Sequence, residues 1–127
     1  MTKILLVEQD TVLRGLMRSC LERAGHDVVA VPKARDALRC RAAGVVADLI
    51  ITDVDCRGNS TIDYTDALVG HAGDVPVLGI VQTRYVNGFP VPSHRARTLG
   101  VTDTLVQPFS NQAFLGAVDR LLVARTA

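Results

Sequence analysis

The sequence predicts an α/β fold, a three-layer doubly wound sheet of five parallel strands between five helices. Short runs of Ile, Leu and Val alternate along the chain with segments in which apolar residues recur at helical spacing. Several of these runs are apolar without interruption, as in strands that are covered on both faces. Alternation of strands and helices implies right-handed crossovers, and such crossovers make the sheet parallel.

Length and composition limit the class of protein. The chain has 127 residues, and we expect residues 1–127 to form a single domain. Hydrophobic residues make up 48% and charged residues 21%, which excludes a disordered chain. The formal net charge of +1 gives no excess of positive charge for binding nucleic acid. The chain has neither an apolar run long enough to span a bilayer nor a signal peptide pattern, so a cytoplasmic protein without membrane contact is expected.

The first half of the chain is expected to contain three strands and two helices. Residues 3–7 form a continuous apolar run that predicts the first strand. Thr11 is the expected N-cap of a helix whose apolar residues recur at helical spacing until Gly25. The next expected elements are a strand over 27–31, a helix over 33–43 and a strand over 48–53.

The second half is expected to contain two strands and three helices. Asn87-Gly88, Pro90 and Pro92 exclude a regular helix or a central strand, so residues 82–92 are expected to form a loop. The final helix places Phe114 and other apolar residues on one face. The expected elements are a helix over 61–71, a strand over 75–81, a helix over 93–99, a strand over 102–106 and a helix over 110–124.

Polar side chains follow the first and third expected strands. Glu8, Gln9 and Asp10 come directly after the first strand, and Asp53 and Asp55 lie at the end of the third. Carboxyl ends of parallel strands meet at one edge of a sheet, and oxygen-rich pockets of this kind bind Mg²⁺. The alternative is that these acidic residues only cap helices and turns.

Four segments occur in a recognisable order: KILLVEQD at 3–10, DLIITD at 48–53, VPVL at 75–78 and GVTDTLVQPF at 100–109. With these segments the sequence resembles the receiver domains of two-component response regulators over nearly its whole length. The resemblance implies a CheY-like, flavodoxin-like sheet with the strand order 2-1-3-4-5. It also implies transfer of a phosphoryl group from a histidine kinase to one Asp with the help of Mg²⁺. Asp53 falls at that phosphoacceptor position.

The expected metal site departs from the family's pattern. The family holds Mg²⁺ with acidic residues after the first strand, with the acceptor Asp, and with a backbone carbonyl two residues further on. Gln9 stands in place of the main metal-binding Asp, and its amide brings no charge. Asp55 stands at the carbonyl position, where its carboxylate either replaces that charge or repels the incoming phosphoryl group. We expect weak or absent Mg²⁺ binding by the candidate ligands Glu8, Gln9, Asp10, Asp53 and Asp55.

The residues that sense the phosphoryl group in the family are also replaced. Val81 stands where a Thr or Ser is expected, and Thr83 comes two residues later. Gln107 replaces a Lys that pairs with the phosphoryl oxygens, and Thr104 replaces a switch aromatic. If each lost electrostatic contact is worth about 3 kcal/mol, the loss of two slows phosphorylation by about four orders of magnitude.

The segment from Gln82 to Gly100 is longer than is typical of receivers. It is either a rebuilt docking surface or a tolerated surface insertion. Tyr85 and Phe89 lie within it, where aromatic side chains can anchor a protein partner or pack into the core. Arginines of the first two helices, Arg14 among them, are expected on solvated helix faces.

The sequence therefore favours an atypical single-domain response regulator that acts by binding protein, with weak or absent phosphorylation, and not as an enzyme. The alternative is a working phosphoacceptor that takes a phosphoryl group from a histidine kinase onto Asp53 with Mg²⁺. A third class, a flavodoxin-like domain that binds a nucleotide, would need a Gly-rich or Ser/Thr-rich turn after the first strand. The expected partners are a histidine kinase or a downstream regulator, and a homodimer is a further candidate assembly.

Overall fold

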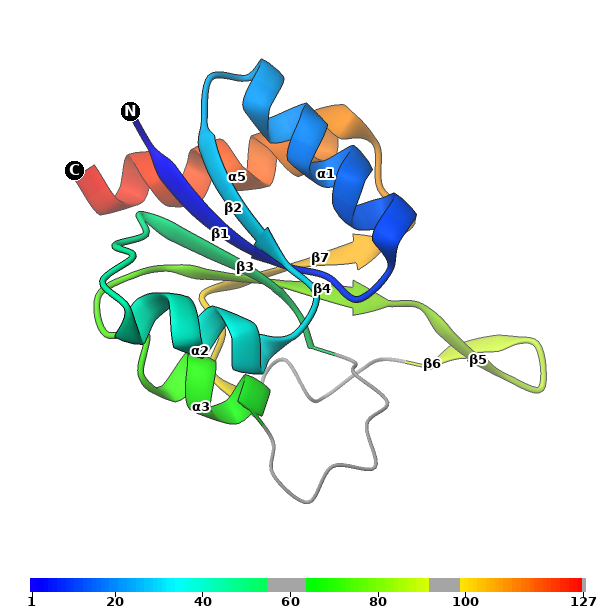
Figure 1. Cartoon of the computed structure of the whole chain (residues 1–127). Helices are drawn as coiled ribbons and strands as arrows, with labels where there is room; N and C mark the ends of the chain where they lie inside the picture. The colour runs from blue at the N-terminus through cyan, green and yellow to red at the C-terminus, as the bar shows by residue number, and fades with distance from the viewer. Residues whose placement is uncertain (55–63, 92–98, 127) are drawn as a thin grey trace.

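The computed structural model describes residues 1–54, 64–91 and 99–126, and it contains a five-stranded parallel sheet between two layers of helices (Figure 1). The sheet strands are β1 (Lys3–Val7), β2 (Asp27–Val31), β3 (Leu49–Asp53), β4 (Val77–Gln82) and β7 (Asp103–Gln107). The helices are α1 (Thr11–Arg23), α2 (Ala34–Ala42), α3 (Tyr64–Gly70) and α5 (Asn111–Thr126). The strand order is β2-β1-β3-β4-β7, which confirms the predicted fold class and topology.

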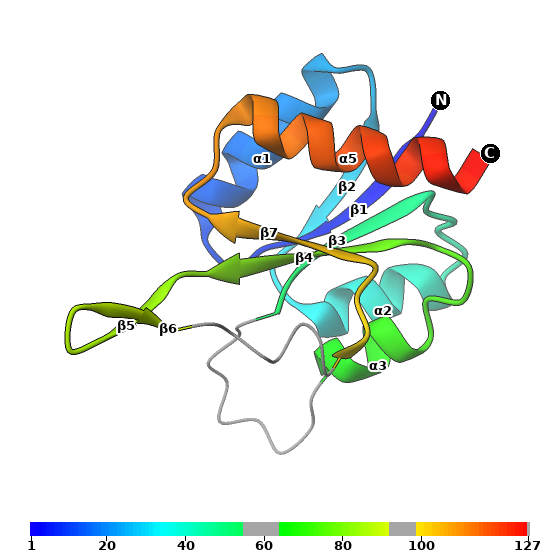
Figure 2. The same ribbon diagram turned by 180° about the vertical axis from the view of Figure 1, so that it is seen from behind.

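The sheet is covered on both faces, which explains the uninterrupted apolar runs in its strands. Alternate side chains of a strand point to opposite faces. Ile4 and Ile51 belong to the cluster that includes residues of α1 and α5, whereas Leu5 and Ile50 belong to the cluster that includes residues of α2 and α3. These side chains have no exposed surface. Figure 2 shows α1 and α5 on one side of the sheet and α2 and α3 on the other. Burial on both sides leaves the strand ends as the places where the sheet can carry polar groups.

The helical layer on the side of α1 and α5 is built around Phe114. Its side chain is 1% exposed and stacks on Phe109, with the ring centroids 5.4 Å apart. Met17 and Leu21 of α1 belong to the same cluster, together with Val118 of α5. Both helices are therefore anchored to the sheet by one continuous apolar cluster.

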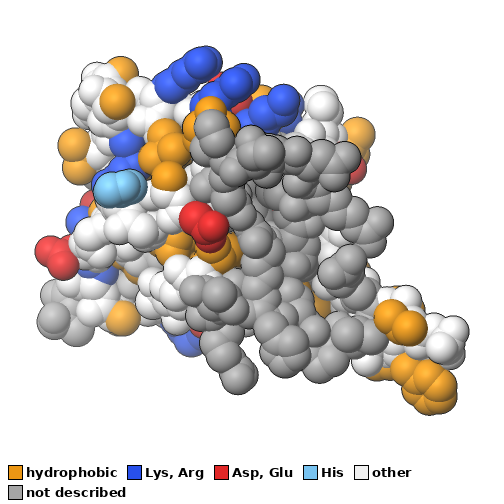
Figure 3. Space-filling model, turned by 90° about the horizontal axis from the view of Figure 1, so that it is seen from below, with side chains coloured by type: hydrophobic (Ala, Val, Ile, Leu, Met, Phe, Trp, Pro, Cys, Tyr) orange, Lys and Arg blue, Asp and Glu red, His pale blue; other side chains and the backbone are white. Residues whose placement is uncertain are grey.

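The expected loop over 82–92 is wrong, because most of these residues form an antiparallel hairpin. Its strands are β5 (Arg84–Val86) and β6 (Phe89–Val91). Asn87 and Gly88 have φ values of 52° and 82°, and two successive positive values are typical of a type I′ turn, which joins two strands tightly. Pro90 is tolerated because the ribbon has only two strands, so both are edges. The hairpin extends away from the sheet, and hydrophobic side chains gather at its projecting end (Figure 3).

Of the expected helix over 93–99, residues 93–98 lie outside the described part of the chain, and only Leu99 is described. Four helices are present among the residues that the structure describes, compared with the five expected. None of the described helices is both long and apolar enough to cross a membrane.

Replacing Phe114 with Ala should lower the free energy of unfolding by about 3–5 kcal/mol, because the change leaves a cavity against the sheet. Urea unfolding followed by circular dichroism measures this loss. Val123, which is 66% exposed on the same helix, provides the matched control. Val123→Ala should change stability by about 0.5 kcal/mol or less. A similar loss in both variants would contradict the assignment of Phe114 to the core.

Candidate functional site

The carboxyl ends of the strands bring Glu8 and Asp53 together. Register pairs Val7 of β1 with Thr52 of β3, so the next residues, Glu8 and Asp53, are neighbours across the two strands. Asp53 is half-buried, and the hydroxyl of Thr52 donates a hydrogen bond of 3.2 Å to its backbone carbonyl. The two predicted acidic positions therefore meet at one edge of the sheet.

Glu8 is the buried carboxylate of this site, with 5% of its surface exposed. Burial raises the pKa of Glu8 above its ordinary value of 4.5, and the neighbouring Asp53 and Asp10 carboxylates raise it further. Two interactions act in the opposite direction on this pKa: a 3.2 Å hydrogen bond from the Asp10 N–H to Oε1, and the charge of Arg14. Since desolvation is the largest effect, the fold favours the protonated form of Glu8.

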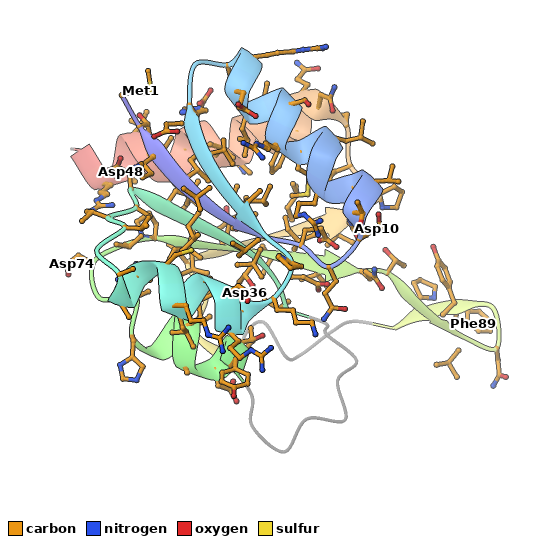
Figure 4. The ribbon with its side chains drawn as sticks, in the orientation of Figure 1. Met1, Asp10, Asp36, Asp48, Asp74 and Phe89 are labelled. Carbon is orange, nitrogen blue, oxygen red and sulfur yellow. The ribbon has the colours of Figure 1, made fainter. Side chains whose placement is uncertain are left out.

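Asp10 caps the first helix, and the expected cap Thr11 is instead the first residue of α1. The Asp10 backbone is extended, and its Oδ1 accepts a 2.9 Å hydrogen bond from the N–H of Leu13 (Figure 4). Helix capping is the alternative to metal binding that the sequence analysis gave for the acidic residues. Asp10 is better placed than Thr11 to cap the helix, because the side chain of a residue just before the first turn can reach the free N–H groups of that turn.

Arg14 belongs to the site, so its expected place on a solvated helix face is wrong. Its Nη1 donates hydrogen bonds of 2.9 Å to the Glu8 carbonyl and 3.4 Å to the Gln9 carbonyl. A cation close to a helix N-terminus opposes the helix dipole, and this unfavourable position is the signal in the sequence that could have identified Arg14. The guanidinium holds the loop after β1 against α1.

The candidate metal ligands are only partly assembled among the described residues. Glu8 and Asp53 are adjacent, Gln9 is exposed, and the Asp10 carboxylate is engaged as a cap. Asp55 lies outside the described residues. Within residues 1–54, 64–91 and 99–126, no group of three His, Cys, Asp or Glu side chains is placed to hold a metal ion.

The ends of β4 and β7 carry the candidate switch positions. Val81 is buried and clusters with Val54, Leu99 and Val101. The structure therefore has a packed aliphatic side chain at the position where the resemblance predicts a hydroxyl.

The hydroxyl of Thr83 donates a 2.9 Å hydrogen bond to the backbone carbonyl of Gln107. This bond joins the chain beyond β4 to the end of β7, and the hydroxyl is thereby committed to a backbone group. Thr104 lies on β7 with its side chain exposed.

A groove of about 450 Å³ opens beside these strand ends. It lies between α1, the base of the hairpin and the connection from β7 to α5. Its lining residues are Leu13, Gln82, Thr83, Tyr85, Gln107, Pro108 and Phe109. Tyr85 and Phe89 are 67% and 73% exposed, so they project from the hairpin and do not pack into the core. Phe89 lies at the projecting end of the hairpin, well away from Asp10 (Figure 4).

Comparison with protein families gives a match over residues 4–119 to the response regulator receiver domain. The response regulator protein FleR of Pseudomonas aeruginosa is 33% identical over 127 residues, and the match covers 93% of this chain and 24% of FleR. The DNA-binding transcriptional regulator NtrC of Rhizobium meliloti is 29% identical over 120 residues, covering 94% of this chain and 24% of NtrC. This chain thus spans about a quarter of the length of these two relatives.

Among solved structures, the chemotaxis response regulator CheY4 of Vibrio cholerae superposes with a TM-score of 0.76. It is 24% identical, and the match covers 95% of this chain and 98% of CheY4. A similarity at this level of identity establishes the shared fold.

Replacing Asp10 with Ala should lower the free energy of unfolding by about 1 kcal/mol, because the Leu13 N–H loses its acceptor. Chemical unfolding of Asp10→Ala and Asp10→Asn distinguishes the cap from the charge. Asn retains a side-chain oxygen, so Asp10→Asn should remain close to the wild type in stability. Equal losses in the two variants would show that the charge of Asp10, and not its capping bond, stabilises the fold.

Stability should depend on pH through Glu8. A carboxyl whose pKa is raised by folding stabilises the protein while it stays protonated, and this contribution is lost as the pH rises from 4.5 through the raised value. The stability of Glu8→Gln relative to the wild type should therefore increase between pH 4 and pH 7 in urea unfolding.

The matched control for this pH dependence is Glu22→Gln on the exposed part of α1. Glu22 pairs with Arg18 at the surface, and an exposed pair of this kind is worth about 0.5 kcal/mol or less. Its stability should differ from that of the wild type by no more than this amount. A difference between Glu8→Gln and the wild type that stays constant over the same pH range would contradict the burial of a raised-pKa carboxyl.

Proposed function

This chain belongs to the response regulator receiver domain family, and from that premise we propose that it is an atypical receiver that signals through protein contacts. In this proposal Asp53 is phosphorylated weakly or not at all, and the domain acts as a binding module and not as an enzyme. Receiver domains interact with histidine kinases and with effector domains. A histidine kinase or a downstream regulator is therefore the proposed class of partner.

The observation that carries the proposal is the packing of Val81. Its side chain lies in an aliphatic cluster with Val54, the residue directly after Asp53. An aliphatic side chain cannot donate a hydrogen bond to a phosphoryl oxygen. Movement of Val81 toward Asp53 would also expose apolar surface of the cluster, which costs free energy. The end of β4 therefore favours a fixed conformation over a phosphorylation switch.

The neutral side chain at the end of β7 supports the same proposal. Gln107 carries no positive charge, and its carbonyl accepts the Thr83 hydroxyl. Phosphoryl transfer to a carboxylate depends on cations that neutralise the phosphoryl oxygens. The fixed cation of the family is absent from this position, so transfer to Asp53 should be slow.

Receiver domains in general bind Mg²⁺ at the phosphorylation site, and the residues of this chain fit the ion only in part. Glu8 and Asp53 are the adjacent carboxylates that would hold it, and the ion would supply positive charge opposite the phosphoryl oxygens. Gln9 adds no charge, and burial favours the protonated form of Glu8. We propose that these features weaken Mg²⁺ binding.

The second candidate function is a working phosphoacceptor. It is favoured by the register that brings Glu8 beside Asp53, which preserves part of the acidic site. Both candidates predict a folded receiver, and they differ in the rate at which Asp53 reacts. A phosphodonor assay therefore decides between them.

Incubation of the wild type with Mg²⁺ and acetyl phosphate should yield little adduct by intact-protein mass spectrometry. The double variant Gln9→Asp/Gln107→Lys restores a metal ligand and the fixed cation, and it should react about 10² to 10⁴ times faster. Asp53→Asn in both backgrounds is the control for the acceptor position. Stoichiometric labelling of the wild type that disappears in Asp53→Asn would establish the working phosphoacceptor.

A further inference from the structure

The hairpin of β5 and β6 has one edge that is competent to pair with another strand. A two-residue turn makes Val86 and Phe89 the first hydrogen-bonded pair, so the next pair, Tyr85 and Pro90, is a non-hydrogen-bonded pair. Residues of such a pair direct their backbone N–H and C=O groups away from the partner strand. Tyr85 presents both groups on the outer edge of β5, whereas Pro90 has no N–H to present on the outer edge of β6.

The open edge of β5 carries no strand in the part of the chain that the structure describes. The hairpin forms a two-stranded sheet separate from the main sheet, and it projects from the molecule (Figures 1 and 2). An isolated two-stranded hairpin has marginal stability in water, and an exposed edge is a template for a further strand. The outer edge of β5 is thus the place where a further strand would add stability.

Both faces of the ribbon are apolar near this edge. Alternation places Val86 and Phe89 on one face and Tyr85 and Pro90 on the other. Val86 is 58% exposed, and Tyr85 and Phe89 are more exposed still. A strand added at β5 would cover part of this apolar surface as well as satisfy the backbone groups of Tyr85.

We propose that the occupant of this edge is β5 of a second copy of the chain, paired antiparallel about a two-fold axis at Tyr85. The two hairpins then form a continuous four-stranded sheet in the order β6-β5-β5-β6. The edge is self-complementary, because the outward N–H and C=O of Tyr85 meet the same two groups of Tyr85 in the second copy. The same register pairs residue 84 of one copy with residue 86 of the other.

A second copy fits the edge better than an unrelated extended peptide. A three-residue edge offers few backbone hydrogen bonds, so apolar contact must supply much of the binding free energy. A second copy brings a matching apolar ribbon, whose turn end passes the base of the first hairpin. The apolar groove lined by Leu13, Tyr85 and Phe109 lies at that base. A net charge of +1 per chain opposes this association only weakly.

The interface is small, so the dimer belongs to the class of weak assemblies, with a dissociation constant of about 10 to 100 μM. Sedimentation velocity of the full 127-residue chain, from about 5 to 500 μM, should show the 13.6 kDa monomer converting to a species of twice that mass. A wild type that remains monomeric over this whole range would overturn the proposal.

Tyr85→Pro tests the edge directly. It removes the outward N–H and leaves the ladder of the hairpin intact, because Tyr85 donates no bond to β6 in this register. This variant should associate at least 10-fold more weakly than the wild type. Tyr85→Phe retains the N–H and the ring, and it should dimerise as the wild type does. Association that is unchanged in Tyr85→Pro but lost in Val106→Glu, on the exposed part of β7, would place the interface elsewhere and contradict the proposal.

A cross-linking measurement keeps the proposal testable if Tyr85→Pro disturbs the hairpin. Residues that face each other in a hydrogen-bonded pair have Cα atoms about 5.5 Å apart, which suits a disulfide. Tyr85→Cys should therefore form a disulfide-linked dimer on mild oxidation, well above the background of the wild-type cysteines. Asn87→Cys, at the turn and away from the axis, is the matched control. Equal cross-linking of the two variants would contradict the two-fold axis at Tyr85.

Dimerisation through β5 does not depend on phosphorylation of Asp53. Sedimentation measures association, whereas the phosphodonor assay measures modification of one carboxylate. A wild type that dimerises and also labels fully would refute the weak phosphorylation and leave the dimer in place. A wild type that stays monomeric and is not labelled would refute the dimer and leave the proposal of weak phosphorylation in place.

Discussion

Burial of both faces of the central sheet is the constraint on which the rest of the molecule depends. Ile4, Leu5, Ile50 and Ile51 are completely buried between two helical layers, so the interior of each central strand has no place for a charge. Polar chemistry is thereby confined to the strand ends. Glu8 sits at this boundary, one residue beyond the apolar run of β1, and its raised pKa is the direct consequence of its burial there.

The same constraint supports the proposal that Asp53 is phosphorylated weakly or not at all. At the end of β4 the apolar packing continues through Val81 into the cluster with Val54, so packing replaces a hydrogen-bonding group next to Asp53. The hydroxyl that follows, on Thr83, is used to join β4 to the Gln107 carbonyl at the end of β7. These contacts stabilise one arrangement of the strand ends, which supports the proposed role as a binding module.

Beyond these strand ends the chain leaves the sheet as a hairpin, and the constraint of burial no longer applies. Tyr85 and Phe89 stay exposed because no layer of the described structure covers the ribbon. Backbone pairing becomes the organising interaction there, and the position of Pro90 leaves β5 as the edge with a complete set of donors and acceptors. The proposed dimer therefore rests on the backbone groups of this edge and on the exposed side chains beside it.

The sequence by itself determined the five strands of the sheet, because their apolar runs reflect burial on both faces. It determined the strand order through the family resemblance. It also determined that Glu8 meets Asp53, because both residues lie at the carboxyl ends of parallel strands. It also contained the Asn87-Gly88 signal for the hairpin, although the nearby prolines favoured a loop. Only the tertiary structure decided that Asp10 caps α1, that Arg14 reaches the carbonyls of Glu8 and Gln9, and that the aromatic residues of the hairpin are exposed. The Asp10 cap is a local contact, and its assignment depends on where the first turn of α1 begins. The contacts of Arg14 and the exposure of the hairpin depend on which groups come within hydrogen-bonding or packing distance in the folded chain, and helical or strand periodicity does not report such distances.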